Sequence, residues 1–374
     1  MRTLNGLNVG PESVVIYGAG LIGGYVAAML GAEPARCQVA LVCRPRLGQA
    51  IAANNGLAAT RLFDANGAKS EHSVSKVRVD AVASLDDVRA RTTAPAFLVV
   101  TMKRGSVAAA ITEMRQVGLD EDTKKRDGDA WYWKDCTIVM MQNGVAPSQI
   151  ALDTLGKSLN IIEAMFPFNV ANVDNNPANF AQGSAGLVFI SDTPEGRRFA
   201  SLLTDSGIEA AVSEDMKSVQ YGKLFINLNN AVSALSAVPL KRELFQHQYR
   251  KVLSLCMTEA LAVYAAANIT PHAFMKLPYS VVARFLGSPD FLYNNISGFF
   301  LPVSDTATSS MYEDLASNRT TEIDYLQGHI SELGRKYGVT TPVSDKIVFL
   351  IKQAEAKKQG LVPHSGDEIL SAKI

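Results

Sequence analysis

The sequence predicts an α/β protein of two domains, a doubly wound parallel sheet followed by an all-helical domain. Short runs of β-branched residues alternate with helical segments from Ser13 to about Ala211, which is typical of a parallel sheet with helices on both faces. After about Ser213, long helical segments replace the strand-like runs. A chain of 374 residues is long enough for two domains that each bury a core. We therefore expect domains at residues 1–213 and 214–374.

The first domain is expected to contain short apolar strands, namely Val14–Tyr17, Val39–Cys43, Ala96–Thr101, Thr137–Met141, Ile161–Phe166 and Leu187–Ile190. The segments between them with helical character are Gly23–Leu30, Leu47–Asn54, Leu85–Ala90, Ser106–Met114 and Ala146–Leu155. Two polar segments, Phe63–Ser75 and Gly118–Asp135, are predicted to be surface insertions. We interpret the charge run inside the second segment as a solvated loop.

The second domain is expected to consist of helices without strands. Their predicted ranges are Asp215–Ala237, Tyr249–Asn268, Tyr279–Phe285, Ser310–Tyr337 and Ser344–Gln359. The sequence contains no internal repeat and no low-complexity segment. This half is therefore interpreted as one helical domain that packs against the first.

Composition limits the class of function. The 36 basic and 36 acidic residues balance, so the charge does not indicate a nucleic acid or an anionic membrane as partner. The cysteines are scattered without a C-x-x-C pair, which favours buried free thiols over a metal site or disulfides. The N-terminus lacks a signal-peptide pattern, and no apolar run approaches the ~20 residues that span a bilayer. We expect a cytoplasmic protein without a metal.

The first predicted strand leads directly into a glycine motif. Residues 14–23 read V-V-I-Y-G-A-G-L-I-G, an apolar run followed by G-x-G-x-x-G and then a helical segment. Glycine spacing alone is a weak signal, but its position between a strand and a helix predicts a Rossmann-type dinucleotide site. The alternative is a glycine-rich turn in an unrelated sheet. The residues expected to contact the cofactor are Gly18, Ala19, Gly20, Leu21, Ile22 and Gly23.

Each glycine of the motif has a distinct expected purpose. Gly18 permits the tight turn, and Gly20 lets the backbone approach the pyrophosphate. Gly23 lets the helix pack close to the strand. The N-terminus of that helix would present free N–H groups to the anion.

The end of the second strand indicates which dinucleotide is bound. Proteins that bind NAD usually carry an acid there, whereas this chain continues V-A-L-V-C into Arg44, Pro45 and Arg46. A carboxylate would repel the 2′-phosphate of NADP, and a guanidinium can bind it with paired hydrogen bonds. We therefore predict NADP(H). Lys103 follows the next strand and is a second candidate for this pocket, with an ordinary exposed lysine as the alternative.

A helical segment around Lys223 carries the main signal for chemistry. It is mostly apolar, yet Lys223, Asn227 and Asn230 stand at i, i+4 and i+7 and would form one polar stripe. A buried lysine has a lowered pKa, which brings it toward a useful range for acid–base chemistry. The alternative is a lysine at the edge of the helix that reaches water.

Two further polar positions follow in the helical half. Ser310 and Glu313 have the spacing of a capping box, so the start of that helix could face an anionic substrate. Glu322 stands in the run T-E-I-D-Y, which we expect to be helical. The alternative for Glu322 is a glutamate that faces the solvent.

With these motifs the chain resembles the ketopantoate reductases (2-dehydropantoate 2-reductases) over nearly its whole length. The features that carry the resemblance are the glycine motif, the Lys103 element, Gln142-Asn143-Gly144, Lys223-x-x-x-Asn227, Ser309-Ser310-Met311 and Thr321-Glu322-Ile323-Asp324. The resemblance implies a Rossmann domain and a helical domain with the active site in the cleft between them. It also implies NADPH-dependent reduction of a 2-oxo acid, with ketopantoate as the leading substrate, as in pantothenate biosynthesis.

The resemblance further implies roles for individual residues. Lys223 matches the catalytic lysine of the family, which stabilises the developing alkoxide and donates the proton. Glu322 matches the glutamate that hydrogen-bonds the substrate and helps to set the charge of the lysine. Asn227 and Ser310 match positions that bind the substrate, the latter near its carboxylate.

The same resemblance assigns the cofactor residues. Asn143 matches the asparagine that lies at the nicotinamide end of the cofactor. We therefore expect Asn143 to contact both the cofactor and the substrate. Arg44 and Lys103 match the basic residues at the adenosine phosphate. The implied small-molecule partner is a 2-oxo acid, and a homodimer is a candidate assembly.

Two positions depart from the family pattern. An asparagine is usual eight residues after the lysine and another three residues before the Ser310 position, but this chain has Ala231 and Ala307 there. Asn230 is a candidate replacement for the first, and Thr306 or Thr308 for the second. These departures keep two alternatives open: a related NADP-dependent dehydrogenase for another oxo or hydroxy acid, and a non-catalytic regulatory protein that binds NADP(H).

Overall fold

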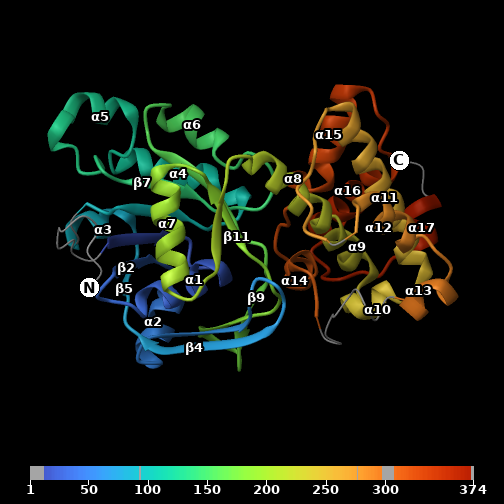
Figure 1. The fold of residues 1–374 in the computed structure, drawn as a ribbon, viewed down its shortest axis with the longest axis horizontal. Helices are drawn as coiled ribbons and strands as arrows, with labels where there is room; N and C mark the ends of the chain where they lie inside the picture. Colours follow the sequence, from blue (N-terminus) through green and yellow to red (C-terminus); the bar gives the residue numbers. More distant parts are fainter. Residues whose placement is uncertain (1–11, 92–93, 276, 297–306, 372–374) are drawn as a thin grey trace. The chain divides into compact units, whose positions relative to one another are not determined.

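The computed structural model describes residues 12–91, 94–275, 277–296 and 307–371. The chain divides into two compact units, Met1–Met216 and Lys217–Ile374 (Figure 1). The division comes where the sequence pattern changes from strands to helices. Each unit is described separately below.

An eight-stranded sheet in the order β12-β11-β8-β7-β6-β1-β2-β5 forms the centre of the first unit. The strands are β1 (Glu12–Tyr17), β2 (Cys37–Val42), β5 (Asp80–Val82), β6 (Phe97–Val100), β7 (Thr137–Met140), β8 (Ile161–Met165), β11 (Val188–Ser191) and β12 (Ala210–Ser213). The run β5-β2-β1-β6-β7-β8 is parallel throughout, which is the 3-2-1-4-5-6 order of a Rossmann sheet. Strand β11 pairs antiparallel with β8 and parallel with β12. The predicted Rossmann-type fold is therefore confirmed, with this added antiparallel pairing at one edge.

Helices cover both faces of this sheet. They are α1 (Leu21–Gly31), α2 (Pro45–Ala53), α3 (Leu85–Arg91), α4 (Val107–Gln116), α6 (Gln149–Leu155) and α7 (Pro194–Asp205), with a short 3₁₀ turn η1 (Arg104–Ser106) before α4. Side chains of β1 alternate between the two faces. Val14 and Ile16 share a core with α1 and α7, whereas Val15 and Tyr17 share another with α3 and α4.

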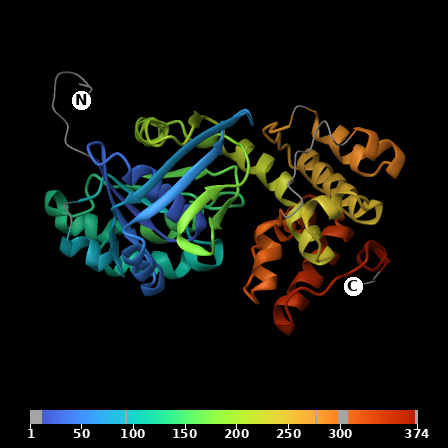
Figure 2. The same ribbon diagram turned by 90° about the horizontal axis from the view of Figure 1, so that it is seen from below.

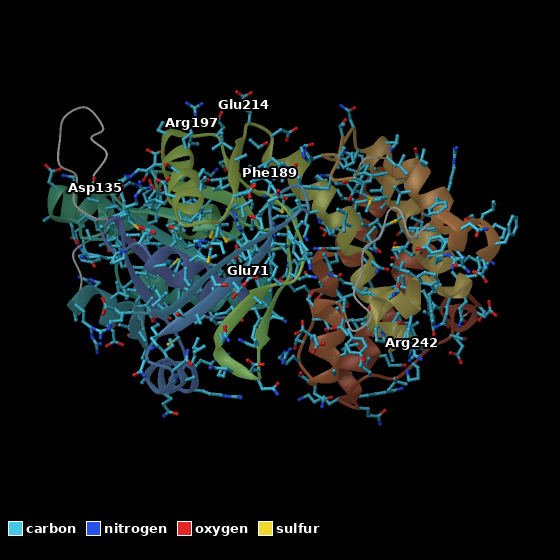
Figure 3. The ribbon with its side chains drawn as sticks, turned by 60° about the horizontal axis from the view of Figure 1, so that its bottom comes forward. Glu71, Asp135, Phe189, Arg197, Glu214 and Arg242 are labelled. Atoms are coloured by element: carbon cyan, nitrogen blue, oxygen red, sulfur yellow. The ribbon has the colours of Figure 1, made fainter. Side chains whose placement is uncertain are left out.

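A second sheet of four strands, in the order β4-β3-β10-β9, was not expected from the sequence. Its strands are β3 (Leu57–Phe63), β4 (Lys69–Val77), β9 (Val170–Val173) and β10 (Asn176–Gln182). The segment Phe63–Ser75, predicted to be a surface insertion, contains the end of β3 and most of the edge strand β4, which pair antiparallel. The polar side chains of this edge strand, such as Glu71 in Figure 3, are mostly exposed, so its sequence carries no apolar run.

The predicted loop at Gly118–Asp135 is also corrected by the structure. Its charge run forms the helix α5 (Glu121–Asp127), followed by the 3₁₀ turn η2 (Gly128–Ala130). The carboxylate of Asp120 caps α5 by accepting a hydrogen bond from the Thr123 N–H at 2.9 Å. Trp131 and Trp133 are buried, and both indole N–H groups donate to backbone carbonyls at the end of α4. Buried tryptophans therefore anchor a segment that was interpreted as solvated.

In the second unit the described residues contain helices and no strands (Figure 2). The helices are α8 (Met216–Asn227), α9 (Asn229–Ser236), α10 (Leu240–Leu244), α11 (His247–Ala266), α12 (Tyr279–Leu286), α13 (Asp290–Ile296), α14 (Ser310–Ala316), α15 (Gln327–Tyr337), α16 (Pro342–Lys357) and α17 (Gly366–Ser371), with the 3₁₀ turn η4 (Ile323–Tyr325). The prediction of an all-helical second domain is confirmed. None of the helices within the described ranges is long and apolar enough to cross a membrane.

Two predicted helices are interrupted. The expected helix Asp215–Ala237 is divided into α8 and α9 at Leu228. The expected helix Ser310–Tyr337 is divided into α14, η4 and α15. Asn318 follows α14 with φ of +53°, a left-handed conformation that ends a right-handed helix.

Candidate functional site

The turn after β1 has the shape that its glycines require. Gly18 has φ of +114°, and a Cβ atom there would lie 2.6 Å from the backbone nitrogen of Met102. A Cβ atom on Gly23 would lie 2.1 Å from the carbonyl oxygen of Gly18. The hydroxyl of Thr101 donates a hydrogen bond to the same carbonyl. The first and third glycines are therefore needed for the fold itself.

Gly20 differs from the other two glycines of the motif. It precedes α1 with φ of −81°, a conformation open to any residue, and a Cβ atom there would meet no other atom within 4 Å. Helix α1 has no side-chain cap and no acid in its first turn. The space beside Gly20 and the uncapped helix start together fit the pyrophosphate of a dinucleotide.

The other three residues of the motif that were predicted to contact the cofactor differ in exposure. Ala19 and Ile22 pack against the core of the first unit. Leu21 is 44% exposed. Ala19 and Ile22 are thus oriented toward the core, and the backbone is the part of the turn available to a ligand.

Three predicted cofactor residues lie just beyond the carboxyl ends of neighbouring parallel strands. Arg44 follows β2, Lys103 follows β6 and Asn143 follows β7. In the strand order β2-β1-β6-β7 these positions flank the glycine turn at one edge of the sheet. The position between β1 and β6 is the topological switch point of a Rossmann sheet, where ligands bind.

The end of β2 carries positive charge in an accessible position. Arg44 is the N-cap residue of α2, and both Arg44 and Arg46 are exposed. The one residue between β2 and Arg44 is the buried Cys43. This donor set fits a phosphate at the ribose, because a guanidinium can offer paired hydrogen bonds to it.

The segment around Asn143 is held by side chains on both sides. The Gln142 amide donates to the carbonyl of Val100 on β6 at 2.8 Å, and Arg104 donates to the carbonyl of Val145 at 2.7 Å. Gly144 has φ of +88°, which explains a glycine at this turn. The sequence did not reveal that Gln142 holds this segment against β6, although the dipeptide Asn143-Gly144 is a signal for a turn.

Lys223 is partly exposed on α8 of the second unit. The surrounding protein nevertheless reduces the hydration of its ammonium group, which lowers the pKa of Lys223 to about 8. The neighbouring Gly222 is a residue that sequence reasoning missed. A Cβ atom there would lie 2.3 Å from the carbonyl oxygen of His272. A glycine inside a helical pattern is the signal that could have revealed this close packing.

The predicted polar stripe crosses the interruption between α8 and α9. Asn227 is buried at the end of α8, and Asn230 lies in the first turn of α9. The amide of Asn230 donates to Ser310 Oγ at 3.5 Å, and Ser309 Oγ donates to the backbone carbonyl of Asn230 at 3.0 Å. The structure thus brings two predicted substrate residues, Asn230 and Ser310, together from distant parts of the sequence.

The predicted capping box at Ser310 is wrong. The N-cap of α14 is Ser309, which has extended backbone and accepts the Tyr312 N–H at 3.1 Å. Ser310 is the first helical residue and is exposed. The Glu313 carboxylate accepts a hydrogen bond from Thr308 at 2.6 Å. Because the cap is one residue earlier, the hydroxyl of Ser310 is not needed to cap the helix.

Glu322 does not lie within a helix, contrary to the prediction. It is the half-buried N-cap residue of the turn η4. This turn is tied to α16, since the Thr321 N–H donates to Glu355 at 2.7 Å and Asp324 pairs with Lys352. The backbone around Glu322 is therefore anchored on both sides.

The two positions that depart from the family pattern have structural roles. Ala231 is completely buried in α9. The carbonyl of Ala307 accepts the Leu240 N–H at the start of α10, at 2.9 Å. Thr306 and Thr308 were the candidates to replace the asparagine missing at Ala307. The hydroxyl of Thr308 donates a hydrogen bond to Glu313, and Thr306 lies outside the described residues.

The structure also describes the cysteines and potential metal ligands. Cys37, Cys43, Cys136 and Cys256 are buried free thiols. Within the described ranges, no three side chains of His, Cys, Asp or Glu are grouped so that they could hold a metal ion.

Comparison with known proteins gives a consistent match. The family described as "Ketopantoate reductase PanE/ApbA" matches residues 14–194, and its C-terminal counterpart matches residues 215–355. A 2-dehydropantoate 2-reductase of Mesorhizobium japonicum is 26% identical over 358 residues, covering 92% of this chain and 98% of that protein. One from Caulobacter vibrioides is 26% identical, covering 62% and 75%.

Solved structures share the fold over almost the whole chain. A PanE/ApbA family ketopantoate reductase from Ralstonia eutropha matches with a TM-score of 0.69 and 23% identity, over 93% of this chain and all of that one. A D-mandelate dehydrogenase with NADH and anilino(oxo)acetate matches with a TM-score of 0.68 and 20% identity, over 93% and 99%. Together with the family matches, this shows that the chain belongs to the ketopantoate reductase family.

Proposed function

We propose that this member of the ketopantoate reductase family reduces a 2-oxo acid with NADPH, and that ketopantoate is its leading substrate. The observation that carries the proposal is Lys223, an ammonium group whose pKa is lowered to about 8 on a helix that also carries Asn227. A lysine with this pKa suits proton donation near neutral pH. We also propose that this reaction serves pantothenate biosynthesis. The protein is proposed to be cytoplasmic and to form a homodimer.

The cofactor part of the proposal depends on the first unit. Gly20 leaves room for a pyrophosphate at the start of α1, and Arg44 offers a guanidinium at the end of β2. Lys103 and Asn143 follow the two strands on the other side of the glycine turn. In this assignment Arg44 and Lys103 hold phosphate groups, Asn143 contacts the nicotinamide end, and the bound NADPH supplies the hydride.

Lys223 would perform the proton chemistry. Below its pKa of about 8 the side chain carries a proton. Its positive charge stabilises the negative charge that develops on the ketone oxygen, and its proton then moves to that oxygen. In this assignment Glu322 accepts a hydrogen bond from the substrate.

The neutral polar side chains would orient the substrate. Asn227 and Asn230 carry amide N–H groups that can donate to the carboxylate of a 2-oxo acid, and the exposed hydroxyl of Ser310 lies beside Asn230. Such positioning reduces the entropy lost on reaching the transition state.

The test uses purified protein, NADPH and a panel of branched, linear and aromatic 2-oxo acids. Loss of NADPH absorbance with ketopantoate, at the highest kcat/KM of the panel, is the expected result. If no 2-oxo acid is turned over, the proposed reaction is refuted. Parallel assays with NADH compare the two dinucleotides.

A second candidate is a dehydrogenase for a different oxo or hydroxy acid. Buried Ala231 and the backbone-bonded Ala307 remove two polar side chains from positions where the family usually has asparagine, and a D-mandelate dehydrogenase shares the fold. Higher kcat/KM for an aromatic 2-oxo acid than for ketopantoate would support this candidate.

A further inference from the structure

Helices α8 and α9 follow each other along the chain (Figure 1). The interruption between them lies between Asn227 and Asn230, inside the polar stripe of the proposed site. Leu228 keeps helical angles, with φ of −57° and ψ of −25°, and its N–H bonds to the Leu224 carbonyl at 3.1 Å. Its own carbonyl accepts a hydrogen bond from the side chain of Gln327, at 2.6 Å. The Gln327 side chain therefore contacts the chain at the junction of α8 and α9.

Gln327 lies between two parts of the proposed site, the end of α8 with Asn227 and the turn η4 with Glu322. Its side chain is completely buried, so a carbonyl that lost this donor would not gain water in exchange. It is the first residue of α15 and comes shortly after the turn that Glu322 caps. Leu228 is the residue directly after Asn227, and Lys223 lies one turn earlier on α8.

The position of Gln327 is fixed by a further buried contact. Its amide also lies 3.9 Å from the sulfur of Cys256 on α11. Cys256 is in turn 3.5 Å from the hydroxyl of Ser344 at the start of α16, and Ser344 donates to Glu259 at 2.7 Å. A buried polar chain thus connects the Leu228 carbonyl to α11 and α16.

We propose that Gln327 is a positioning residue, which holds the Leu228 carbonyl and so fixes the helix of Lys223 and Asn227 relative to the turn of Glu322. This inference rests on the proposed function. A carbonyl has two acceptor positions, so loss of the Gln327 donor would leave one position of the buried Leu228 carbonyl unfilled, with no water to replace it. The junction beside Asn227 would then be held less firmly.

The experiment compares Gln327→Met, which keeps length and removes the donor, with Ser331→Ala. Ser331 lies one turn later on α15, is buried, and its hydroxyl has no hydrogen-bond partner in the described structure. We expect kcat with the best 2-oxo acid to fall by about ten- to a hundred-fold in Gln327→Met. The dissociation constant for NADPH should stay at the wild-type value, and Ser331→Ala should behave as wild type.

A second readout does not require activity. The rate at which Lys223 reacts with an acylating reagent, followed against pH by peptide mass spectrometry, reports its pKa. In Gln327→Met we expect this pKa to rise from about 8 toward the ordinary 10.5, as water reaches the loosened helix. Wild-type kcat together with an unchanged labelling profile would overturn the inference.

Should Gln327→Met fail to fold, Gln327→Glu replaces it. A protonated carboxyl can donate to the Leu228 carbonyl, whereas an ionised one cannot. Because burial raises the pKa of a carboxyl group, this variant should keep the donor and a kcat near wild type at neutral pH, and its kcat should fall below that of wild type at higher pH as the carboxyl ionises. A pH profile of kcat identical to that of wild type up to pH ~10 would overturn the inference. Wild-type protein without any oxo acid reductase activity would refute the proposed function alone, since the labelling result stands by itself.

Discussion

The dinucleotide turn of the first unit and the Lys223 region of the second unit are built in opposite ways. The turn uses a short stretch of chain, and its shape follows from Gly18 and Gly23, whose missing side chains allow backbone contact. The Lys223 region uses three separate stretches, joined by the bonds of Asn230 to Ser309 and Ser310 and of Gln327 to Leu228. A local motif can therefore be recognised in sequence, whereas a site built from distant side chains depends on tertiary contacts.

The largest expected effect separates chemistry from cofactor binding. Lys223→Ala should lower kcat by at least ~10²-fold, because it removes the proton donor and the charge that stabilises the alkoxide. The NADPH dissociation constant, measured by fluorescence titration, should stay near wild type. If NADPH binding collapses as well, the division of labour between the two regions is wrong.

The pH profile of the wild-type protein tests the same residue. Since the pKa of Lys223 is lowered to about 8, its proton is present below that pH and lost above it. The rate of reduction should therefore fall about ten-fold per pH unit above pH ~8. A rate that stays constant to pH ~10 would show that Lys223 keeps its ordinary pKa.

Gly20 and Gly23 provide a matched pair within the turn. Gly20→Ala should leave the melting temperature unchanged, because its Cβ atom meets nothing, yet weaken NADPH binding by about ten-fold through overlap with the cofactor. Gly23→Ala should lower the free energy of unfolding by ~1–3 kcal/mol, since its Cβ atom would lie against the Gly18 carbonyl. Equal melting temperatures for the two variants would contradict this assignment.

Arg44 tests which dinucleotide is preferred. Arg44→Ala should weaken NADPH by about ten- to a hundred-fold, the value of a charge-assisted hydrogen bond to phosphate. NADH, which lacks the 2′-phosphate, should be affected much less. Arg242→Ala, which removes an exposed arginine on α10 of the second unit, is the control for general surface charge. Equal losses for both dinucleotides would make Arg44 a structural residue.

The smallest expected effect concerns the buried carboxyl of Glu243 on α10. Burial raises the pKa of Glu243 well above its usual value, with Asn229 and Ser233 of α9 as neighbours that partly oppose the shift. Its contribution to stability is fully present below pH 4.5 and declines at higher pH, where the unfolded chain gains by ionising.

Glu243→Gln removes that ionisation. The free energy of unfolding of this variant, measured with urea, should therefore decline less than that of wild type between pH ~5 and ~8. Glu332→Gln, on the exposed side of α15, controls for the loss of a surface charge. A wild-type pH dependence in Glu243→Gln would show that the carboxyl ionises freely in the fold.

Periodicity located β1, β2, β6 and β7 because these strands are mostly buried and consist of apolar runs. It missed β5 and β12, the short strands at the two edges of the eight-stranded sheet. It also missed β4, whose exposed edge carries polar residues and is held by backbone bonds to β3. The charge run at α5 was misread for a related reason, since its anchors are the two tryptophans that follow it. The hydrophobic pattern of a segment does not show whether its backbone pairs with another strand or whether neighbouring residues anchor it.

Candidate site residues show the same limit. The glycine motif, Lys223 and the basic residue after β2 could be identified in sequence, because spacing along one element defines them. The cap at Ser309 was misplaced by one residue, since Ser309 and Ser310 offer identical hydroxyls and only backbone angles distinguish them. Gln327 carries no sequence signal, because its importance lies in a carbonyl on another helix.

By itself, the sequence determined six strands of the eight-stranded sheet, the helical nature of the second unit, the dinucleotide turn and the positive charge at the end of β2. These features follow from local backbone preference and from charge, which act over a few residues. The tertiary structure decided the second sheet, the hydrogen bond of Gln327 to Leu228 and the meeting of Asn230 with Ser310. Each of these requires hydrogen bonds between distant segments, and the geometry of such bonds exists only once the chain has folded.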